Sequence, residues 1–567
     1  MEKIWLKNYP QGIPAEINPD LYKSLADVFE QTCKEYPALP AFYNLGVTLS
    51  FQELYVLSEA FAAYFQSVLN LKKGDRLAIM LPNVLQYPVV MFGAFRAGLT
   101  VVNINPLYTP PELVHQLKDS GAETLVVLEN FVGVVKEALT SIQLKHVIVT
   151  KMGDLFPQPK AFLINFYLKY IQKKVPHITL PQALSFKEAL EKGKQLTFKP
   201  VEISHQDIAF LQYTGGTTGI AKGAMLTHRN MVANVMQAEA WFNPILERGK
   251  EIIITALPLY HIFSLTANCL FIFKTGGLNV LITNPRDLSH AISEMGKFKF
   301  TAITGVNTLF NGLLKNPHFA HLDFSQLKLS LGGGMSVQQA VAEKWHALTG
   351  MPILEAYGLT ETSPCVAVNP PNLKYYNGTV GLPVSSTNVA ILDENSKELG
   401  FNQPGELGVK GPQVMYGYWR NQAETQKVFT QDGWLLTGDI ATIDEQGYLR
   451  IVERKKDMIL VSGFNVYPNE IEDVIARSWG VKEVAVVGVP DETSGEVVKA
   501  YVVKDNPALT ANDILRYCHK NLTGYKIPKH VEFVEELPKT SVGKILRRAL
   551  RDDISPNADN PHHQRPA

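Results

Sequence analysis

From about residue 25 to residue 360 the sequence alternates short apolar runs with longer segments of helical periodicity. Apolar runs of strand length lie at 76–81, 124–128, 146–150, 252–257, 280–283 and 301–306. Helical patterns separate them, for example at 54–68, 112–119 and 337–348. This alternation predicts βαβ units, in which buried parallel strands are covered by helices. We therefore expect an α/β fold with a large N-terminal domain of βα sheets.

The pattern changes twice in the C-terminal third of the chain. Short alternating runs punctuated by Gly and Pro follow residue 378 and predict a small β-barrel-like subdomain. Beyond residue 456, one helix pattern at 468–477 and three strand patterns predict a small α+β domain. The predicted units are a core at 1–453 (βα sheets to about 378, barrel-like part about 379–453), a hinge at 454–457, a mobile domain at 458–551 and a disordered tail at 552–567.

Composition excludes several classes of protein. A chain of 567 residues with 46% hydrophobic content is expected to fold into more than one globular domain. Lys+Arg and Asp+Glu both number 54, so no net charge attracts nucleic acid. The N-terminus has no signal-peptide pattern, and no apolar run reaches the length of a membrane span. The four dispersed cysteines predict reduced thiols, and we expect a cytoplasmic protein whose oligomeric state, including a homodimer, stays open.

A glycine- and threonine-rich loop at 213–223 is the most informative motif. Closely spaced glycines let a backbone fold around a bulky anion, threonines supply hydroxyl donors, and a lysine adds positive charge. These residues are Tyr213, Thr214, Gly215, Gly216, Thr217, Thr218, Gly219 and Lys222. A P-loop of the GxxxxGK[ST] type does not fit, because Ala221 and Gly223 stand where Gly and Ser/Thr are required. The motif predicts a phosphate loop of another type.

The motif resembles the phosphate loop of the adenylate-forming (acyl-activating) enzymes. The runs Leu-Pro-Asn-Val-Leu-Gln-Tyr at 81–87 and Asn-Ile-Asn-Pro-Leu-Tyr-Thr at 103–109 are similar to those of bacterial long-chain fatty acid–CoA ligases. The resemblance covers nearly the whole chain. It implies an enzyme that uses ATP and Mg²⁺ to convert a long-chain fatty acid to an acyl-adenylate, and then transfers the acyl group to CoA.

Tyr-Gly-Leu-Thr-Glu at 357–361 follows a strand-like run and carries an aromatic ring, a hydroxyl and a carboxylate. By itself this pattern also fits an ordinary strand-to-helix turn. The resemblance implies that Tyr357 packs on adenine, that Thr360 contacts the α-phosphate, and that Glu361 helps to hold Mg²⁺. It also implies nucleotide contacts for Gly333, Gly358 and Thr214. The metal ligands that it implies are Thr214 and Glu361.

The remaining candidate residues lie in the C-terminal third of the chain, apart from His261. The resemblance implies that Asp439 and Arg454 hold the ribose, and that the small domain turns at Lys456. It also implies that Ser462 and Gly463 enter the CoA site. Lys544, in a Pro-Lys-Thr-x-x-Gly-Lys context, is implied to bridge the carboxylate and the α-phosphate during adenylation. His261 stays open between an ordinary core residue and one that positions the acyl carboxylate.

The segment 159–175 combines aromatic residues with four lysines and contains no acid. Two interpretations stay open: a helix packed on the main domain, or a helix at the interface of an anionic membrane. The second is the hypothesis of peripheral contact with the inner face of the cytoplasmic membrane. For the activity, the alternatives are a fatty acyl-AMP ligase or adenylating enzyme that serves a carrier protein, and a non-catalytic fatty-acid or nucleotide sensor.

Overall fold

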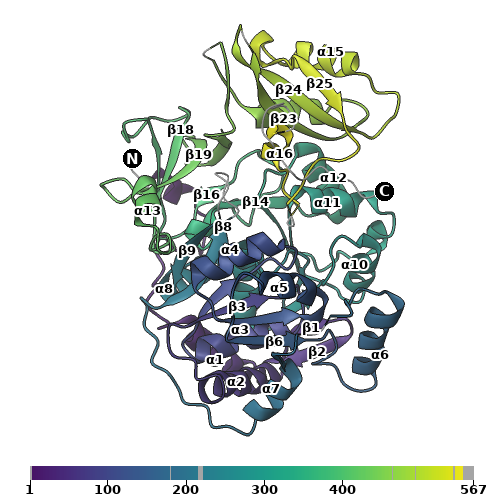
Figure 1. Ribbon diagram of the computed structural model, residues 1–567. Helices are drawn as coiled ribbons and strands as arrows, with labels where there is room; N and C mark the ends of the chain where they lie inside the picture. The colour runs from purple at the N-terminus through teal and green to yellow at the C-terminus, as the bar shows by residue number, and fades with distance from the viewer. Residues whose placement is uncertain are drawn as a thin grey trace.

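The computed structural model describes residues 3–178, 180–214, 221–462, 464–491, 493–540 and 543–552. These residues form four sheets. Two of them, with their helices, build the large domain in the lower part of Figure 1, and the C-terminal domain lies above it. No helix in the described part of the chain is long and apolar enough to cross a bilayer. The expected α/β class, with a smaller C-terminal α+β domain, is confirmed.

The first large sheet has the order β7-β6-β5-β3-β4-β8-β9 and is parallel except for β9, which pairs antiparallel with β8. Its strands are β3 (Arg76–Met80), β4 (Thr100–Asn103), β5 (Thr124–Leu128), β6 (His146–Thr150), β7 (Ala183–Ser185), β8 (Ile208–Thr214) and β9 (Lys222–Thr227). Side chains of β3, β4 and β5 are buried on both faces, as expected of a sheet covered by helices.

The second large sheet has the order β16-β15-β14-β13-β12-β10-β11-β1-β2. Its strands are β1 (Pro40–Asn44), β2 (Val47–Ser50), β10 (Ile252–Thr255), β11 (Leu278–Leu281), β12 (Ala302–Gly305), β13 (Leu329–Gly333), β14 (Ile353–Gly358), β15 (Cys365–Val368) and β16 (Leu382–Pro383). Because β10 to β14 are parallel, their carboxyl ends share one edge. Ligands of α/β proteins usually bind at such an edge.

Local sequence signals set the helix ends. Ser50 and Glu53 form a capping box, which starts α2 earlier than the apolar periodicity suggested. Thr109 and Glu112 do the same for α4, and Gly121 ends that helix in a left-handed conformation. The helices of the large domain include α1 (Leu25–Glu35), α2 (Phe51–Ser67), α3 (Gln86–Arg96), α4 (Pro110–Ser120), α5 (Val132–Ala138), α6 (Lys160–Phe166), α7 (Phe186–Gly193), α8 (His228–Phe242), α9 (Ile262–Ser264), α10 (Leu288–Met295), α11 (Asn307–Lys315) and α12 (Gln339–Thr349).

The barrel-like part is an antiparallel sheet of order β17-β18-β19-β20, at the left of Figure 1. Its elements are β17 (Asn388–Leu392), β18 (Gly405–Lys410), α13 (Gln422–Val428), β19 (Leu435–Ile443) and β20 (Leu449–Arg454). The N-terminal segment packs against this part of the chain. Trp5 is 1% exposed, and a Cβ on Gly447 would lie 2.6 Å from the Trp5 backbone, so only glycine fits there.

The C-terminal domain has the sheet order β22-β21-β24-β23, with β25 beside β24. Its elements are β21 (Ile459–Val461), β22 (Phe464–Val466), α14 (Pro468–Ala476), β23 (Val481–Asp491), β24 (Gly495–Lys504), α15 (Ala511–Asn521), β25 (His530–Phe533) and α16 (Arg547–Asp552). Its last loop contacts the large domain, where Thr308 Oγ1 donates to the carbonyl oxygen of Gly543 at 3.3 Å. Lys315 and Asp505 add an ion pair of 3.2 Å.

Candidate active site

A cavity of about 1070 Å³ lies where the large domain, the antiparallel sheet and the C-terminal domain meet. Residues from β8, β13, β14, β19 and β20 contribute to its wall, together with the last loop of the chain. The candidate residues from the sequence that line it are Tyr213, Thr214, Lys222, His261, Gly333, Tyr357, Gly358, Thr360, Glu361, Asp439, Arg454, Lys456 and Lys544. Three separate folding units therefore bring their motifs to one cavity.

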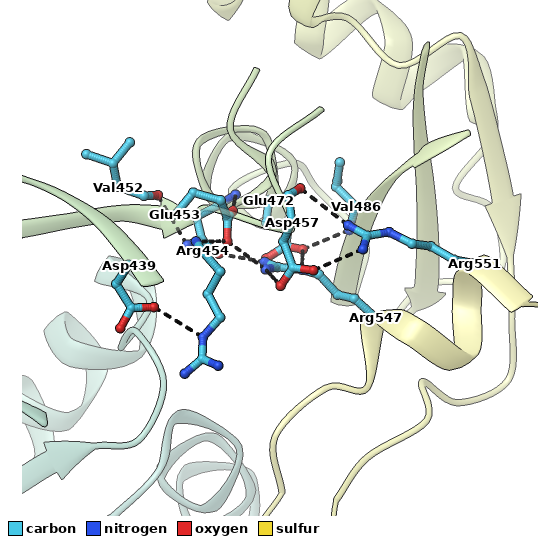
Figure 2. Close-up of polar contacts among 10 residues, drawn as sticks. Asp439, Val452, Glu453, Arg454, Asp457, Glu472, Val486, Arg547 and Arg551 are labelled. Carbon is cyan, nitrogen blue, oxygen red and sulfur yellow. Dashed lines mark hydrogen bonds and ion pairs between the residues drawn. The ribbon is translucent and has the colours of Figure 1, made fainter. Parts of the chain in front are cut away.

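Tyr357, Asp439 and Arg454 form a connected group in this wall. The Tyr357 hydroxyl donates to Asp439 Oδ2 at 2.6 Å. Arg454 Nε lies 3.3 Å from Asp439 Oδ1 (Figure 2). Burial raises the pKa of the Asp439 carboxyl, while the charge of Arg454 and the Tyr357 hydrogen bond oppose that shift. Since Arg454 is partly exposed, its guanidinium can still reach a ligand in the cavity.

Lys544 enters the cavity from the C-terminal domain. Its backbone closes a turn with Thr540, in which Gly543 takes a left-handed conformation. The side chain reaches Gly334, where an added Cβ would lie 3.2 Å from Lys544 Cε. Burial lowers the pKa of Lys544 to about 8, and the charge of Arg454 acts in the same direction. A dehydrated ammonium of this kind interacts strongly with a nearby anion.

Glu361 lies in the short 3₁₀ turn Thr360–Thr362 directly after β14. Its carboxylate accepts a hydrogen bond of 2.8 Å from the Tyr418 hydroxyl. Within the described residues, no cluster of three or more His, Cys, Asp or Glu side chains could hold a metal ion. One carboxylate suits Mg²⁺, which is usually held by one or two carboxylates together with substrate phosphates and water.

The predicted phosphate loop lies between β8 and β9, and Thr214 pairs with Lys222 at its two ends. Lys222 forms an ion pair with Glu424 of α13, and its ammonium lies 5.0 Å from the centre of the Tyr418 ring. Tyr213 donates a hydrogen bond to Asp119 of α4. The sequence motifs missed Tyr418, Glu424 and Asp119, because only the tertiary fold brings them to the loop.

Some of the candidate residues do not line the cavity, and others are not among the described residues. Gly215, Gly216, Thr217, Thr218, Gly219 and Gly463 are not among the described residues, nor is the predicted tail beyond residue 552. Ser462 does not line the cavity. Its backbone N–H donates to Ser494 in a loop of the C-terminal domain, and its φ is +50°. In this domain arrangement Ser462 is thus separate from the candidate residues that line the cavity.

His261 and a set of apolar residues also line the cavity. Burial lowers the pKa of His261 to about 3, with Lys544 acting in the same direction, so the ring is neutral at physiological pH. The apolar wall includes Trp241, Phe242, Ile253, Phe263, Ala267, Phe271, Leu329, Leu331 and Met335. A cavity lined by both charged groups and apolar side chains can take an amphipathic acid.

Comparison with known proteins agrees with this arrangement. The family model "AMP-binding enzyme" matches residues 29–419, and "AMP-binding enzyme C-terminal domain" matches residues 470–544. The chain is 56% identical to the long-chain-fatty-acid–CoA ligase of Escherichia coli O157:H7, over 99% of this chain and 100% of that protein. Among solved structures it is similar to ATP-bound MatB from Rhodopseudomonas palustris (27% identity, TM-score 0.78, 93% of this chain and 98% of that one). It is also similar to the Mycobacterium tuberculosis fatty acyl CoA synthetase (26% identity, TM-score 0.68, 94% and 98%).

Proposed function

The chain belongs to the AMP-binding enzyme family, and from that premise we propose that it is an AMP-forming long-chain fatty acid–CoA ligase. The observation that carries this proposal is the position of Lys544. A half-buried lysine from the C-terminal domain lines the same cavity as the Tyr357–Asp439–Arg454 group and a set of apolar side chains. The name of the Escherichia coli relative supports a long-chain fatty acid as the substrate.

In the first half-reaction, a carboxylate oxygen of the fatty acid attacks the α-phosphorus of ATP. The bond from that phosphorus to the oxygen bridging to the β-phosphate breaks, so acyl-adenylate and pyrophosphate form. We assign adenine to Tyr357, the ribose hydroxyls to Asp439 and Arg454, and the α-phosphate to Thr360. The ammonium of Lys544 offsets the negative charge that builds between the carboxylate and the α-phosphate.

The remaining assignments concern the phosphates, the metal and the acid. We assign the β- and γ-phosphates to the loop at 213–222, including Thr217 and Lys222. Glu361 and Thr214 would hold Mg²⁺ together with phosphate oxygens, and the ion would neutralise charge on the leaving pyrophosphate. The neutral ring of His261 suits a role in positioning the acyl carboxylate, since a neutral imidazole can donate one hydrogen bond.

In the second half-reaction, the CoA thiol attacks the acyl-adenylate and displaces AMP. We propose that the domain at 458–551 turns about the hinge at 454–457, which removes Lys544 and brings the Ser462–Gly463 loop to the site. The mixed anhydride is already activated, so this step mainly requires positioning and exclusion of water. The present separation of Ser462 from the cavity is consistent with the adenylation orientation.

Product analysis tests this function against its alternatives. With palmitate and ATP but no CoA, the wild-type enzyme should catalyse palmitate-dependent ATP–pyrophosphate exchange. Addition of CoA should then give palmitoyl-CoA and AMP. A fatty acyl-AMP ligase would show the exchange without palmitoyl-CoA, and a sensor would show neither reaction. Either result would contradict the proposal.

We also propose that the helical segment at 160–171 docks the enzyme on an anionic membrane. Figure 1 places α6 at the right-hand margin of the large domain. It continues into a π-helical turn, Tyr167–Ile171. Phe162 is 63% exposed and Ile171 is 62% exposed, as suits aromatic and aliphatic groups at a lipid interface. The nearby lysines would contact anionic headgroups, so that the insoluble acid reaches the enzyme from the bilayer.

A further inference from the structure

Glu453 makes a direct link between the antiparallel sheet and the C-terminal domain. It is the second-to-last residue of β20, immediately before the proposed hinge. Its side chain is 1% exposed, and both carboxylate oxygens bind groups from beyond the hinge. Oε1 lies 3.0 Å from Arg547 Nη1 (Figure 2). Oε2 accepts a hydrogen bond of 2.9 Å from the backbone N–H of Asn469.

Arg547 is held firmly within its own domain. Its Nη2 and Nε bind the two carboxylate oxygens of Glu472 at 2.7 and 3.1 Å, and Nη2 also donates to Asn469 Oδ1 at 2.6 Å. Glu472 in turn accepts a hydrogen bond from the backbone N–H of Val486 in the domain's sheet. A planar guanidinium with a bidentate partner has little freedom to reorient. Arg547 therefore moves with the C-terminal domain.

The same helix carries a second contact to the hinge. Arg551 of α16 lies 3.1 Å from the carboxylate of Asp457, the last hinge residue (Figure 2). Lys544 precedes α16 by only a short stretch, and the loop that holds it contacts Thr308 of the large domain. The orientation of α16 against β20 thus determines how far Lys544 extends into the cavity.

Rotation of the domain affects the two partners unequally. Arg547 would keep Glu472 and Asn469, which travel with it. Glu453 would stay behind with β20 and lose Arg547 and Asn469, while Oε1 keeps the hydrogen bond of 2.8 Å that it accepts from the backbone N–H of Arg454. A buried carboxylate that has lost its cation is strongly disfavoured, so it must be hydrated before the rotated state is stable. Burial raises the pKa of Glu453, and the charge of Arg547 opposes that shift.

We propose that the Glu453–Arg547 pair is the latch that selects the adenylation orientation, with both side chains acting as positioning residues for Lys544. This inference rests on the proposed two-step function and its domain rotation. The latch contributes to the first half-reaction alone, because the second requires it to be open. Loss of the latch should therefore slow adenylation and leave thioester formation intact.

The test uses the full-length enzyme and measures each half-reaction separately. Palmitate-dependent ATP–pyrophosphate exchange reports adenylation, and release of palmitoyl-CoA from synthetic palmitoyl-adenylate reports the second step. Glu453→Gln removes the charge and leaves Arg547 paired with Glu472. We expect its exchange rate to fall at least about 10-fold, as for a severed buried charge pair, with thioester formation within about 2-fold of wild type.

Two further variants keep the result decisive. Glu532→Gln breaks an ion pair with Lys499 inside the C-terminal domain and should change neither rate. Arg547→Lys keeps the charge but cannot contact Glu453, Glu472 and Asn469 together, and it should reproduce the selective loss. Equal losses in both half-reactions, or unchanged exchange in Glu453→Gln, would overturn the latch. A wild-type enzyme lacking both half-reactions would instead refute the proposed function and remove the basis of the latch.

Discussion

The Tyr357 hydroxyl donates a hydrogen bond of 2.6 Å to the carboxylate of Asp439 and so joins β14 of the large sheet to β19 of the antiparallel sheet. Asp439 is 3% exposed, and its other oxygen faces Arg454. Tyr357 thus has two uses in the proposed site. Its ring offers a surface for adenine, and its hydroxyl fixes the carboxylate that we assign to the ribose.

Tyr357→Phe should keep the ring and remove the hydrogen bond to Asp439. We expect the KM for ATP to rise about 10-fold, since a hydrogen bond to a charged group contributes about 1.5 kcal/mol. Initial-rate kinetics with varied ATP would measure the change, and Tyr416→Phe, at a side chain 76% exposed, serves as the control. An unchanged KM for ATP would show that the Tyr357 hydroxyl does not support the nucleotide site.

The pH dependence of adenylation should follow Lys544. Burial lowers the pKa of this lysine to about 8, so the side chain is a cation below that pH and neutral above it. The exchange kcat/KM for ATP should therefore fall as pH rises through about 8. Lys544→Arg retains its charge to higher pH and should lack this decline, whatever its absolute rate. An identical decline in both enzymes would assign the titration to another group.

Local patterns predicted the strands of the large domain better than they predicted the contacts between domains. β5 and β6 lie at the predicted residues, because a buried strand needs an uninterrupted apolar run. β11 begins two residues before its predicted start, since the buried Asn279 interrupts its apolar pattern. No local pattern predicted that β1 pairs with β11, because that pairing depends on how two distant segments share one sheet.

In the candidate site, too, local patterns predicted individual residues but not the contacts between distant segments. Each motif predicted a chemical group, and most of the described candidates do line one cavity. The partners of those groups were not predictable. Glu424 approaches Lys222 from a different part of the chain, and Arg547 approaches Glu453 across the hinge. Such pairs arise from sheet packing and domain docking, and no local periodicity encodes them.

Substrate length should depend on Ala267. This half-buried residue lies on the π-helical segment Leu265–Ile272 and lines the apolar part of the cavity. Ala267→Trp should fill that part and lower kcat/KM for palmitate at least about 10-fold relative to octanoate, while the KM for ATP stays unchanged. Ala508→Trp, at an exposed position of the C-terminal domain, is the control. Equal effects on both acids would place the acyl chain elsewhere.

Membrane docking should depend on the lysines beside α6. The triple variant Lys169/Lys173/Lys174→Glu reverses the local charge, and we expect its affinity for anionic vesicles in co-sedimentation to fall at least about 100-fold, at about 1 kcal/mol per lysine lost. The variant Lys344/Lys374/Lys397→Glu makes the same charge change at exposed positions elsewhere and should bind as wild type does. Binding of neutral vesicles separates charge from apolar insertion. Unchanged binding of the first variant would refute docking through this segment.

The central proposal is that Lys544 serves the first half-reaction alone, and Lys544→Ala tests it most directly. The variant should lose about 10²–10³-fold in palmitate-dependent ATP–pyrophosphate exchange, as when a charged group that stabilises a transition state is removed. Its conversion of synthetic palmitoyl-adenylate and CoA to palmitoyl-CoA should stay within about 2-fold of wild type. Equal loss of both half-reactions, or normal exchange, would contradict the proposed role of this lysine.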